Sequence, residues 1–184
     1  MKIKPFMKTK NLSFYQVEKE DIEFLTYCHN SYDIRDTFFT DFPTNKIRQE
    51  KEIENLYGNK MNYLPFIVRE NKTDKRIGIT AFHRLDLVSR ATTYSIILPD
   101  KNDWGKHFGT EITKKMISYG FDVLNLNRIQ LHVSVENKPA VKIYENNGFI
   151  QEGRLREAMN HNNKYYDFFL MSILRKEFYN RGNR

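Results

Sequence analysis

The spacing of hydrophobic and polar residues at the start of the chain predicts one strand followed by one helix. Residues 11–17 alternate in polarity and are rich in aromatic and β-branched side chains, which is typical of a strand. The ten residues before them are expected to form a loose or edge segment. Residues 18–30 open with acidic side chains and then place Ile22, Leu25 and Thr26 on one face, which favours an amphipathic helix.

After a loop, a second helix is expected over residues 44–57. Thr44 is a suitable N-terminal cap for this helix, and Gly58 is a suitable stop. Its apolar positions are predicted to be Ile47, Ile53 and Leu56. The first third of the chain is therefore expected to supply one strand and two helices.

The second part of the chain alternates in polarity over most of its length, which predicts a sheet. Residues 63–69 and 76–85 are separated by a polar turn and are expected to pair as a hairpin, which residues 92–98 extend. The remaining elements are predicted to be a helix at 110–124, a strand at 128–135, a short helix at 139–147, and strands at 149–158 and 165–174. This order, without a repeat or a linker, predicts one α+β (α/β) domain over residues 1–184, with helices flanking a mixed central β-sheet.

Composition narrows the class of protein without fixing its activity. The chain has 184 residues, of which 40% are hydrophobic and 14% aromatic, and this suffices for the buried core of a globular protein. No apolar run is long enough for a signal peptide or a membrane span, and the lone Cys28 cannot form an internal disulfide. A cytoplasmic location is therefore expected.

The net charge of +7 suits nucleic acid, a membrane surface or a polyanionic small molecule equally well. No helix-turn-helix, zinc-finger or RNA-binding signature accompanies this charge, so neither nucleic acid nor membrane is expected as a partner. The last ten residues, from Arg175 to Arg184, are rich in Lys and Arg and are expected to fray into solvent.

Residues 104–110 read Trp-Gly-Lys-His-Phe-Gly-Thr and lie between a predicted strand and a predicted helix. Backbone N–H groups and the helix dipole at such a place can hold phosphate, and Gly105 and Gly109 permit a close approach of the backbone. A tight strand-to-helix turn without a ligand would use the same glycines, so this segment alone is a weak signal.

Residues 137–149 read Asn-Lys-Pro-Ala-Val-Lys-Ile-Tyr-Glu-Asn-Asn-Gly-Phe and form a second motif. Asn137, Ala140 and Tyr144 are spaced i, i+3 and i+7, so they share one face of the short helix. That face offers an amide, a small residue that leaves room for a ligand, and a phenol. Tyr144 could equally be an aromatic residue of the core.

Together the two motifs resemble the GNAT superfamily of N-acetyltransferases, whose first motif ends in Q/R-x-x-G-x-G/A and whose second reads N-x-x-A-x-x-x-Y-x-x-x-G-F. The resemblance covers about residues 76–178 and is nearest to the spermidine acetyltransferase and ribosomal-protein N-terminal acetyltransferase group. It implies that residues from about 11 to 60 form the acceptor side. The first motif departs from the family at two positions, because Trp104 replaces Gln or Arg and His107 replaces Gly. His adopts left-handed backbone geometry more readily than most residues other than Gly.

The resemblance also implies a role for particular residues. Acetyl-CoA is the expected donor, no metal is expected, and Tyr144 is the expected general acid that reaches the sulfur. The implied donor-binding residues are Ile96, Ile97, Leu98, Trp104, Gly105, Lys106, His107, Phe108, Gly109, Thr110 and Asn137. Among them, the strand edge at Ile96 to Leu98 is expected to offer peptide groups to the pantetheine amides.

The motifs identify the general base and the acceptor-binding residues less clearly than the donor-binding residues. His83 is the candidate base because it lies on the strand where related enzymes keep polar groups, although a hydrogen-bonded structural histidine is the alternative. Thr92 or Thr93 stands where many relatives carry a Glu. The expected acceptor-binding residues are Tyr32, Asp33, Phe38, Phe39 and Asp41, since aromatic and acidic groups suit a cationic amine. Solvated loop charges would explain these residues equally well.

The leading hypothesis is an acetyl-CoA-dependent N-acetyltransferase in which a primary amine attacks the donor directly within a ternary complex. The acceptor is expected to be a small amine, such as a polyamine or an amino sugar. A protein N-terminus as acceptor, or a regulator that binds acetyl-CoA without turnover, are the alternatives. A homodimer is a further expectation, from fold-level analogy.

Overall fold

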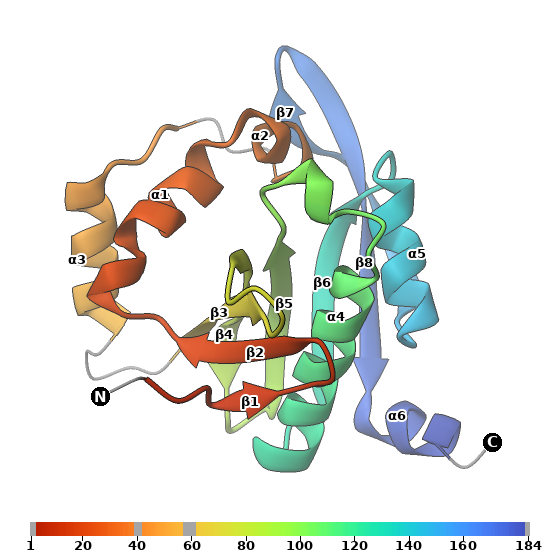
Figure 1. Ribbon diagram of the computed structural model, residues 1–184. Coiled ribbons are helices and arrows are strands. Elements are labelled where there is room, and N and C mark those ends of the chain that lie inside the picture. Colours follow the sequence, from red (N-terminus) through yellow and green to blue (C-terminus); the bar gives the residue numbers. More distant parts are fainter. Residues whose placement is uncertain (1–2, 39–41, 57–61, 183–184) are drawn as a thin grey trace.

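The computed structural model of the chain describes residues 3–38, 42–56 and 62–182. Its centre is one sheet of eight strands in the order β1-β2-β3-β4-β5-β6-β8-β7 (Figure 1). The strands are β1 (Met7–Lys8), β2 (Leu12–Gln16), β3 (Tyr63–Glu70), β4 (Arg76–Asp86), β5 (Ala91–Ile97), β6 (Arg128–Ser134), β7 (Ile150–His161) and β8 (Lys164–Leu174). All neighbours are antiparallel except β5 and β6, which are parallel, so the sheet is mixed as predicted.

Helices cover both faces of this sheet. They are α1 (Ile22–Asn30), α2 (Tyr32–Phe38), α3 (Lys46–Leu56), α4 (Phe108–Ser118), α5 (Lys138–Asn146) and α6 (Arg175–Gly182). Figure 1 shows α1 and α3 together on one side of the molecule and α4 with α5 on the other. Neighbouring side chains on β3 divide between these sides, since Phe66 and Val68 pack with α4 whereas Ile67 packs with α1 and α3. The period of two along the strand thus produces two cores from one sheet.

The parallel pair β5 and β6 separates partway along its length. Within these strands the pairing runs only from Ala91 with Arg128 to Thr93 with Gln130, although β5 continues to Ile97. β6 likewise continues beyond its paired residues, where its other edge stays hydrogen-bonded to β8. The sheet therefore parts at the carboxyl ends of β5 and β6, which is where a ligand can enter an α/β sheet.

Most of the predicted elements are confirmed, but the N-terminal region differs in three respects. A short helix, α2, occupies the segment expected as loop, and it follows α1 directly. The N-terminus of α3 is capped by Asn45, whose Oδ1 accepts a hydrogen bond from the Arg48 backbone at 2.9 Å, and not by Thr44. Ile47 is 64% exposed and does not belong to the apolar face of α3, so its assignment was wrong. Gly58, the expected stop, lies outside the described residues.

The C-terminal segment forms helix α6, contrary to the expectation that it frays. The Glu177 carboxylate accepts a hydrogen bond from the Leu174 backbone at 2.8 Å, which satisfies a donor at the start of the helix. The Phe178 ring lies 5.4 Å from that of Phe121 and packs against the core beneath α4. Basic composition suggested a solvated tail, but one aromatic residue at the right position holds the segment on the domain.

Candidate active site

A cavity of about 570 Å³ opens where β5 and β6 part. The end of β5, the loop that follows it, the first turn of α4, the end of β6 and one side of α5 surround this cavity, and α2 closes it from the other face. Of the residues expected to bind the donor, the structure brings together Ile96, Ile97, Leu98, Trp104, Gly105, His107, Phe108, Gly109, Thr110 and Asn137. Lys106 is the exception, since its ammonium group lies 2.9 Å from Asp103 Oδ1 and outside the cavity lining.

The loop before α4 has the backbone geometry that its sequence required. Gly105 has φ of 75° and His107 has φ of 62°, so both are left-handed. His107 precedes α4 directly, and the Gly-to-His departure is accommodated without a change of conformation at that residue. A Cβ at Gly109 would lie 3.0 Å from Ile143 Cδ1, so this glycine allows α4 to approach α5 closely. The unpaired N–H groups of the first turn of α4 are therefore available to an anion in the cavity.

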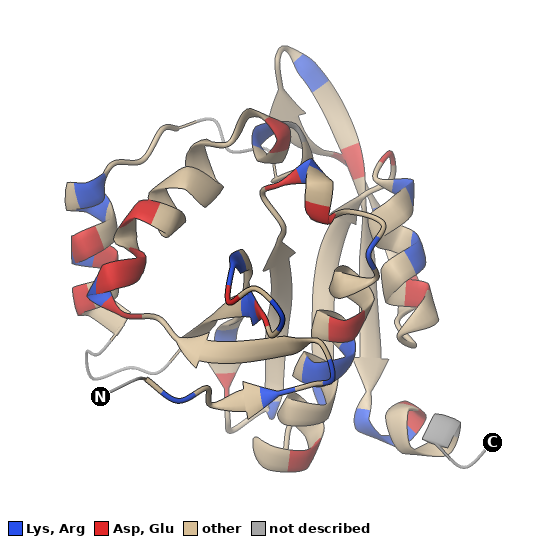
Figure 2. Ribbon diagram, in the orientation of Figure 1, with Lys and Arg blue, Asp and Glu red and all other residues tan. Residues whose placement is uncertain are grey.

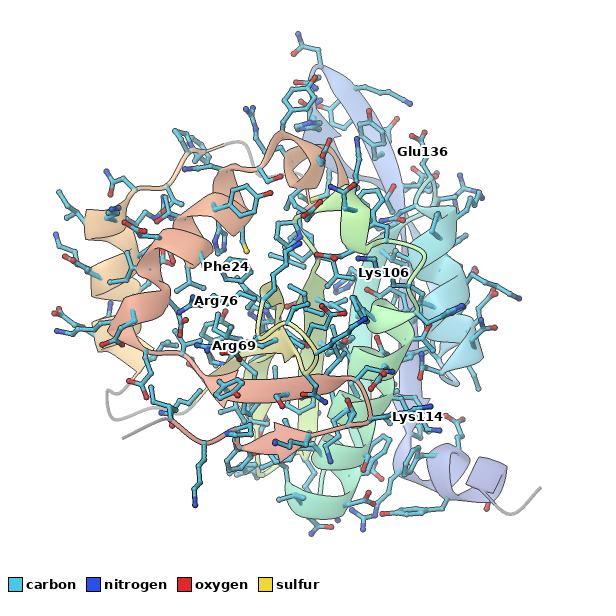
Figure 3. All side chains as sticks on the ribbon, viewed as in Figure 1. Phe24, Arg69, Arg76, Lys106, Lys114 and Glu136 are labelled. Atoms are coloured by element: carbon cyan, nitrogen blue, oxygen red, sulfur yellow. The ribbon has the colours of Figure 1, made fainter. Side chains whose placement is uncertain are left out.

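Lysine and aspartate side chains form ion pairs around this end of the cavity. Asp103 lines the cavity and is 3% exposed, but it contacts two ammonium groups, those of Lys75 at 3.0 Å and Lys106 at 2.9 Å. Hydrogen bonds to Asp100 and then Asp103 raise the pKa of Lys75, which keeps this side chain charged. Figure 2 shows further basic residues on α5, and Figure 3 labels Lys106 on the loop that leads into α4. Because these lysines are paired with aspartates, the feature that favours a phosphate group here is the start of α4, with its unpaired N–H groups.

Tyr144 projects from α5 into the cavity and is 8% exposed. Its ring meets Tyr94 edge-on, with centroids 6.4 Å apart, and Phe149 at 5.7 Å. Burial, with a smaller contribution from Tyr94, raises the pKa of the Tyr144 hydroxyl. The hydroxyl therefore stays protonated at neutral pH and can act as a hydrogen-bond donor to a group in the cavity.

Two polar groups at the cavity wall already have partners within the protein. Asn137 caps α5, since its Oδ1 accepts a hydrogen bond from the Ala140 backbone at 3.2 Å. The Trp104 indole donates to the Leu98 carbonyl at 3.0 Å, which closes the loop onto the end of β5. The Leu98 carbonyl, which was expected to face the donor, is therefore already hydrogen-bonded to Trp104, the residue that replaces Gln or Arg in the family motif.

The structure places His83 on the same sheet face as α1 and α3 but outside the cavity lining. Its Nε2 lies 2.7 Å from Ser95 Oγ, and its ring lies 4.7 Å from that of Tyr63. Burial, followed by the charge of Arg84, lowers the pKa of His83 and favours the neutral imidazole. The contacts are those of a hydrogen-bonded structural histidine, and the assignment of His83 as the base stays a prediction.

Among the expected acceptor-binding residues that the structure describes, only Phe38 lines the cavity. It does so together with its α2 neighbours Ile34 and Thr37. Tyr32 is 76% exposed, and Asp33 pairs with Lys101 at 2.6 Å, so its carboxylate ties α2 to the loop after β5. Phe39 and Asp41 lie outside the described residues.

The cavity also contains residues that the motifs did not indicate. His132 and Ser134 line it from β6, and Phe168 lines it from β8. The alternation of residues 128–135 could have identified the two residues of β6. The apolar residues of this strand face α4, which leaves His132 and Ser134 on the other face. The sequence could not show which helices cover that other face.

Two further observations limit the chemistry of the described residues. Within the ranges that the structure describes, no three His, Cys, Asp or Glu side chains gather into a group that could hold a metal ion. No helix in these ranges is long and apolar enough to cross a membrane.

The sequence and the fold of this chain are similar to those of known acetyltransferases. Residues 11–150 match the model of the acetyltransferase (GNAT) domain family. The chain is 30% identical to the spermidine N(1)-acetyltransferase of Vibrio cholerae over 93% of its own length and 97% of that protein's. It is also 30% identical to a putative ribosomal N-acetyltransferase of Bacillus subtilis, over 54% of each chain. Among solved structures, the spermidine N-acetyltransferase of Vibrio cholerae in complex with CoA and spermine superposes with a TM-score of 0.83 at 28% identity, covering 93% of this chain and 99% of that one.

The chain therefore belongs to the GNAT acetyltransferase family. It is an acetyl-CoA-dependent N-acetyltransferase, which confirms the resemblance that its two motifs predicted.

Proposed function

We propose that the acceptor is a polyamine of the spermidine and spermine type, acetylated on a primary amine. The observation that carries this proposal is the extent of the match, because the Vibrio cholerae spermidine acetyltransferase aligns along 93% of this chain. The putative ribosomal acetyltransferase aligns along 54%. An alignment of nearly the whole chain extends into the N-terminal region that contains α2, and acceptor selection is expected in that region.

The cavity suits the donor at both of its ends. The first turn of α4 and the nearby lysines can hold the phosphates of acetyl-CoA, while the parted edge at Ile96 to Leu98 offers peptide groups to the pantetheine arm. Ala140, on the cavity face of α5, leaves room for this arm beside Tyr144. The donor would supply a thioester, and the protein's task is to align it with the amine.

Tyr144 is proposed as the group that stabilises the departing sulfur. An ordinary phenol, near pKa ~10, and an ordinary thiol, near ~8.5, differ by about 1.5 units, or roughly 2 kcal/mol. Burial raises the pKa of Tyr144 and widens this gap. Hydrogen-bond donation to the sulfur, with the proton moving late, therefore fits this hydroxyl better than early proton transfer does.

We further propose that the chain self-associates as a homodimer or a larger assembly and acts in the cytoplasm. Strand β7 lies at the edge of the sheet and exposes most of its residues, including Leu155 and Met159. A long exposed edge of this kind favours pairing with another chain.

A thiol-release assay with acetyl-CoA tests the acceptor directly. The panel would contain spermidine, spermine, an amino sugar, an aminoglycoside and peptides with free N-termini. We expect the highest kcat/KM for the polyamines, with release of one thiol for each acetylated amine found by mass spectrometry. A peptide or an amino sugar that exceeds both polyamines in kcat/KM would contradict the proposal.

A further inference from the structure

The register of β6 with β8 shows which of their residues lie on the acceptor side of the cavity. Val133 pairs with Phe169, and both pack against the core beneath α4. Directly opposed and alternate residues share a sheet face, so His132 and Ser134 lie on the other face, together with Phe168. His132 is exposed and lines the cavity on that face.

The cavity reaches both faces of the sheet through the gap between β5 and β6. Tyr144 belongs to the core on the α4 face, whereas Ile34 of α2 belongs to the core on the opposite face. Both residues line the same cavity as His132. If Tyr144 marks the sulfur, the amine approaches from the α2 face, and His132 is the titratable side chain that the described lining residues place on that side.

We propose that His132 accepts the proton that the amine must lose, and this inference rests on the N-acetyl transfer proposed above. The amine nitrogen forms a bond to the acetyl carbon as the bond from that carbon to sulfur breaks. The sulfur leaves with the electron pair of that bond and gains one proton, supplied from the Tyr144 side. A protonated amine loses two protons: the first passes to the imidazole of His132 before the attack and then to solvent, and the second leaves the nitrogen as the bond to sulfur breaks, which balances the proton that the sulfur gains.

The other titratable side chains that line the cavity among the described residues do not suit this role. They are Asp103, His107, Lys142 and Tyr144. Asp103 is buried between two ammonium groups, and His107 lies at the start of α4, where phosphates are expected. Lys142 lies on α5, and its side chain is 72% exposed.

The four nearest residues on β6 and β8 bring no charged group to the imidazole of His132. The alternate residues on β6 are Gln130 and Ser134, and the residues opposite on β8 are Leu170 and Phe168. None of these four side chains carries a charge. Histidine is the side chain that most often serves as a general base in proton transfer.

The test compares His132→Gln with His29→Gln, a matched control on α1 in which Nδ1 of the replaced ring lies 2.8 Å from the Leu25 carbonyl oxygen. With saturating acetyl-CoA and varied spermidine, we expect His132→Gln to lose about 10²- to 10⁴-fold in kcat/KM at neutral pH. The loss should shrink toward the ordinary amine pKa of about 10, because the amine then arrives neutral. Added imidazole should restore part of the rate of His132→Ala, and His29→Gln should match the wild type.

A measurement without turnover distinguishes this role from a structural one. In the dead-end complex with CoA, the imidazole NMR signals of His132, identified by their loss in His132→Gln, should move when spermidine is added. The dissociation constant for CoA, from calorimetry, should be the same in wild type and variant. These readings do not depend on the rate of the reaction.

Three results would overturn the inference. The first is a His132→Gln enzyme with the wild-type kcat and pH profile, and the second is a pure rise in the acceptor KM without rescue by imidazole. The third is a pH profile in which the fall of kcat/KM at low pH disappears in His83→Gln but remains in His132→Gln. If the wild type acetylates a different amine, the proposed acceptor fails, and the same comparison run with that amine decides the role of His132 separately.

Discussion

At the scale of single residues, Tyr144 shows how burial can suit a side chain to one role. Its ring is held by Tyr94 and Phe149, while the raised pKa keeps the hydroxyl as a donor. We expect Tyr144→Phe to lower kcat and kcat/KM together by on the order of 10- to 1,000-fold, because only a hydrogen bond made in the transition state is lost. Thiol-release kinetics with saturating acetyl-CoA and a range of acceptor concentrations measure both constants.

Tyr94→Phe is the matched control for this prediction, since it also removes one buried phenol oxygen. The Tyr94 hydroxyl lies 3.0 Å from Thr113 Oγ1 and does not line the cavity. Its loss should cost about 1 kcal/mol of stability and leave turnover per folded molecule unchanged. An unchanged kcat in Tyr144→Phe, with weaker CoA binding or earlier melting, would remove Tyr144 from the mechanism.

The sequence predicted the residues whose roles follow from a continuous motif. It did not predict those whose roles depend on tertiary contacts. The left-handed backbone at His107 could be anticipated, because it follows from the Gly position of a continuous motif. His132 could not be identified in this way. Along β6 it reads as one polar residue in an alternating strand, and only the placement of α2 and the gap beside β5 bring it to the cavity.

At the scale of elements, the approach of β4 to β5 depends on a glycine that no motif marked. A Cβ at Gly78 would lie 2.4 Å from the Ile97 carbonyl oxygen and 2.8 Å from a Leu98 methyl group. A backbone carbonyl cannot yield as a flexible side chain does. We therefore expect Gly78→Ala to destabilise the fold by about 1–3 kcal/mol or more, and to weaken CoA binding because both neighbours line the cavity.

Urea unfolding measures the stability of this variant, and Gly153→Ala on β7 is its control. A Cβ at Gly153 meets nothing within 4 Å, so this substitution should leave the unfolding midpoint near that of the wild type. Equal midpoints for both alanine variants would show that β5 moves aside at little cost.

Elements with a strong local pattern were predicted well, and those that depend on tertiary contacts were not. The hairpin of β3 and β4 and the strands that follow were expected within one residue of their bounds, except that β7 continues to His161 and not only to residue 158. Helix α2 has only seven residues, too few to establish a helical period. Helix α6 is held by Phe178 against the core, and its basic composition concealed this contact.

At the scale of the whole molecule, the open edge of the sheet is the feature that leads to a prediction about assembly. Light scattering of the purified protein should give at least twice the 22.1 kDa mass of one chain. Leu155 on β7 is 42% exposed, and Leu155→Glu should lower that mass by adding a charge to the edge.

Val88→Glu is the control for this substitution, because Val88 is 95% exposed in the turn between β4 and β5, away from the sheet edge. It should retain the mass of the wild type. A wild type that runs as one chain at every concentration would contradict self-association, and an unchanged mass in Leu155→Glu would place the contact elsewhere.

The parting of β5 and β6 has a consequence for the lifetime of the protein. Peptide groups that lose their neighbour at the gap need other partners, and the amides of a bound pantetheine arm can supply them. A ligand that binds only the folded state adds to the free energy of unfolding according to its concentration. The abundance of acetyl-CoA in the cell would then influence how long each molecule escapes proteolysis, as well as how fast it works.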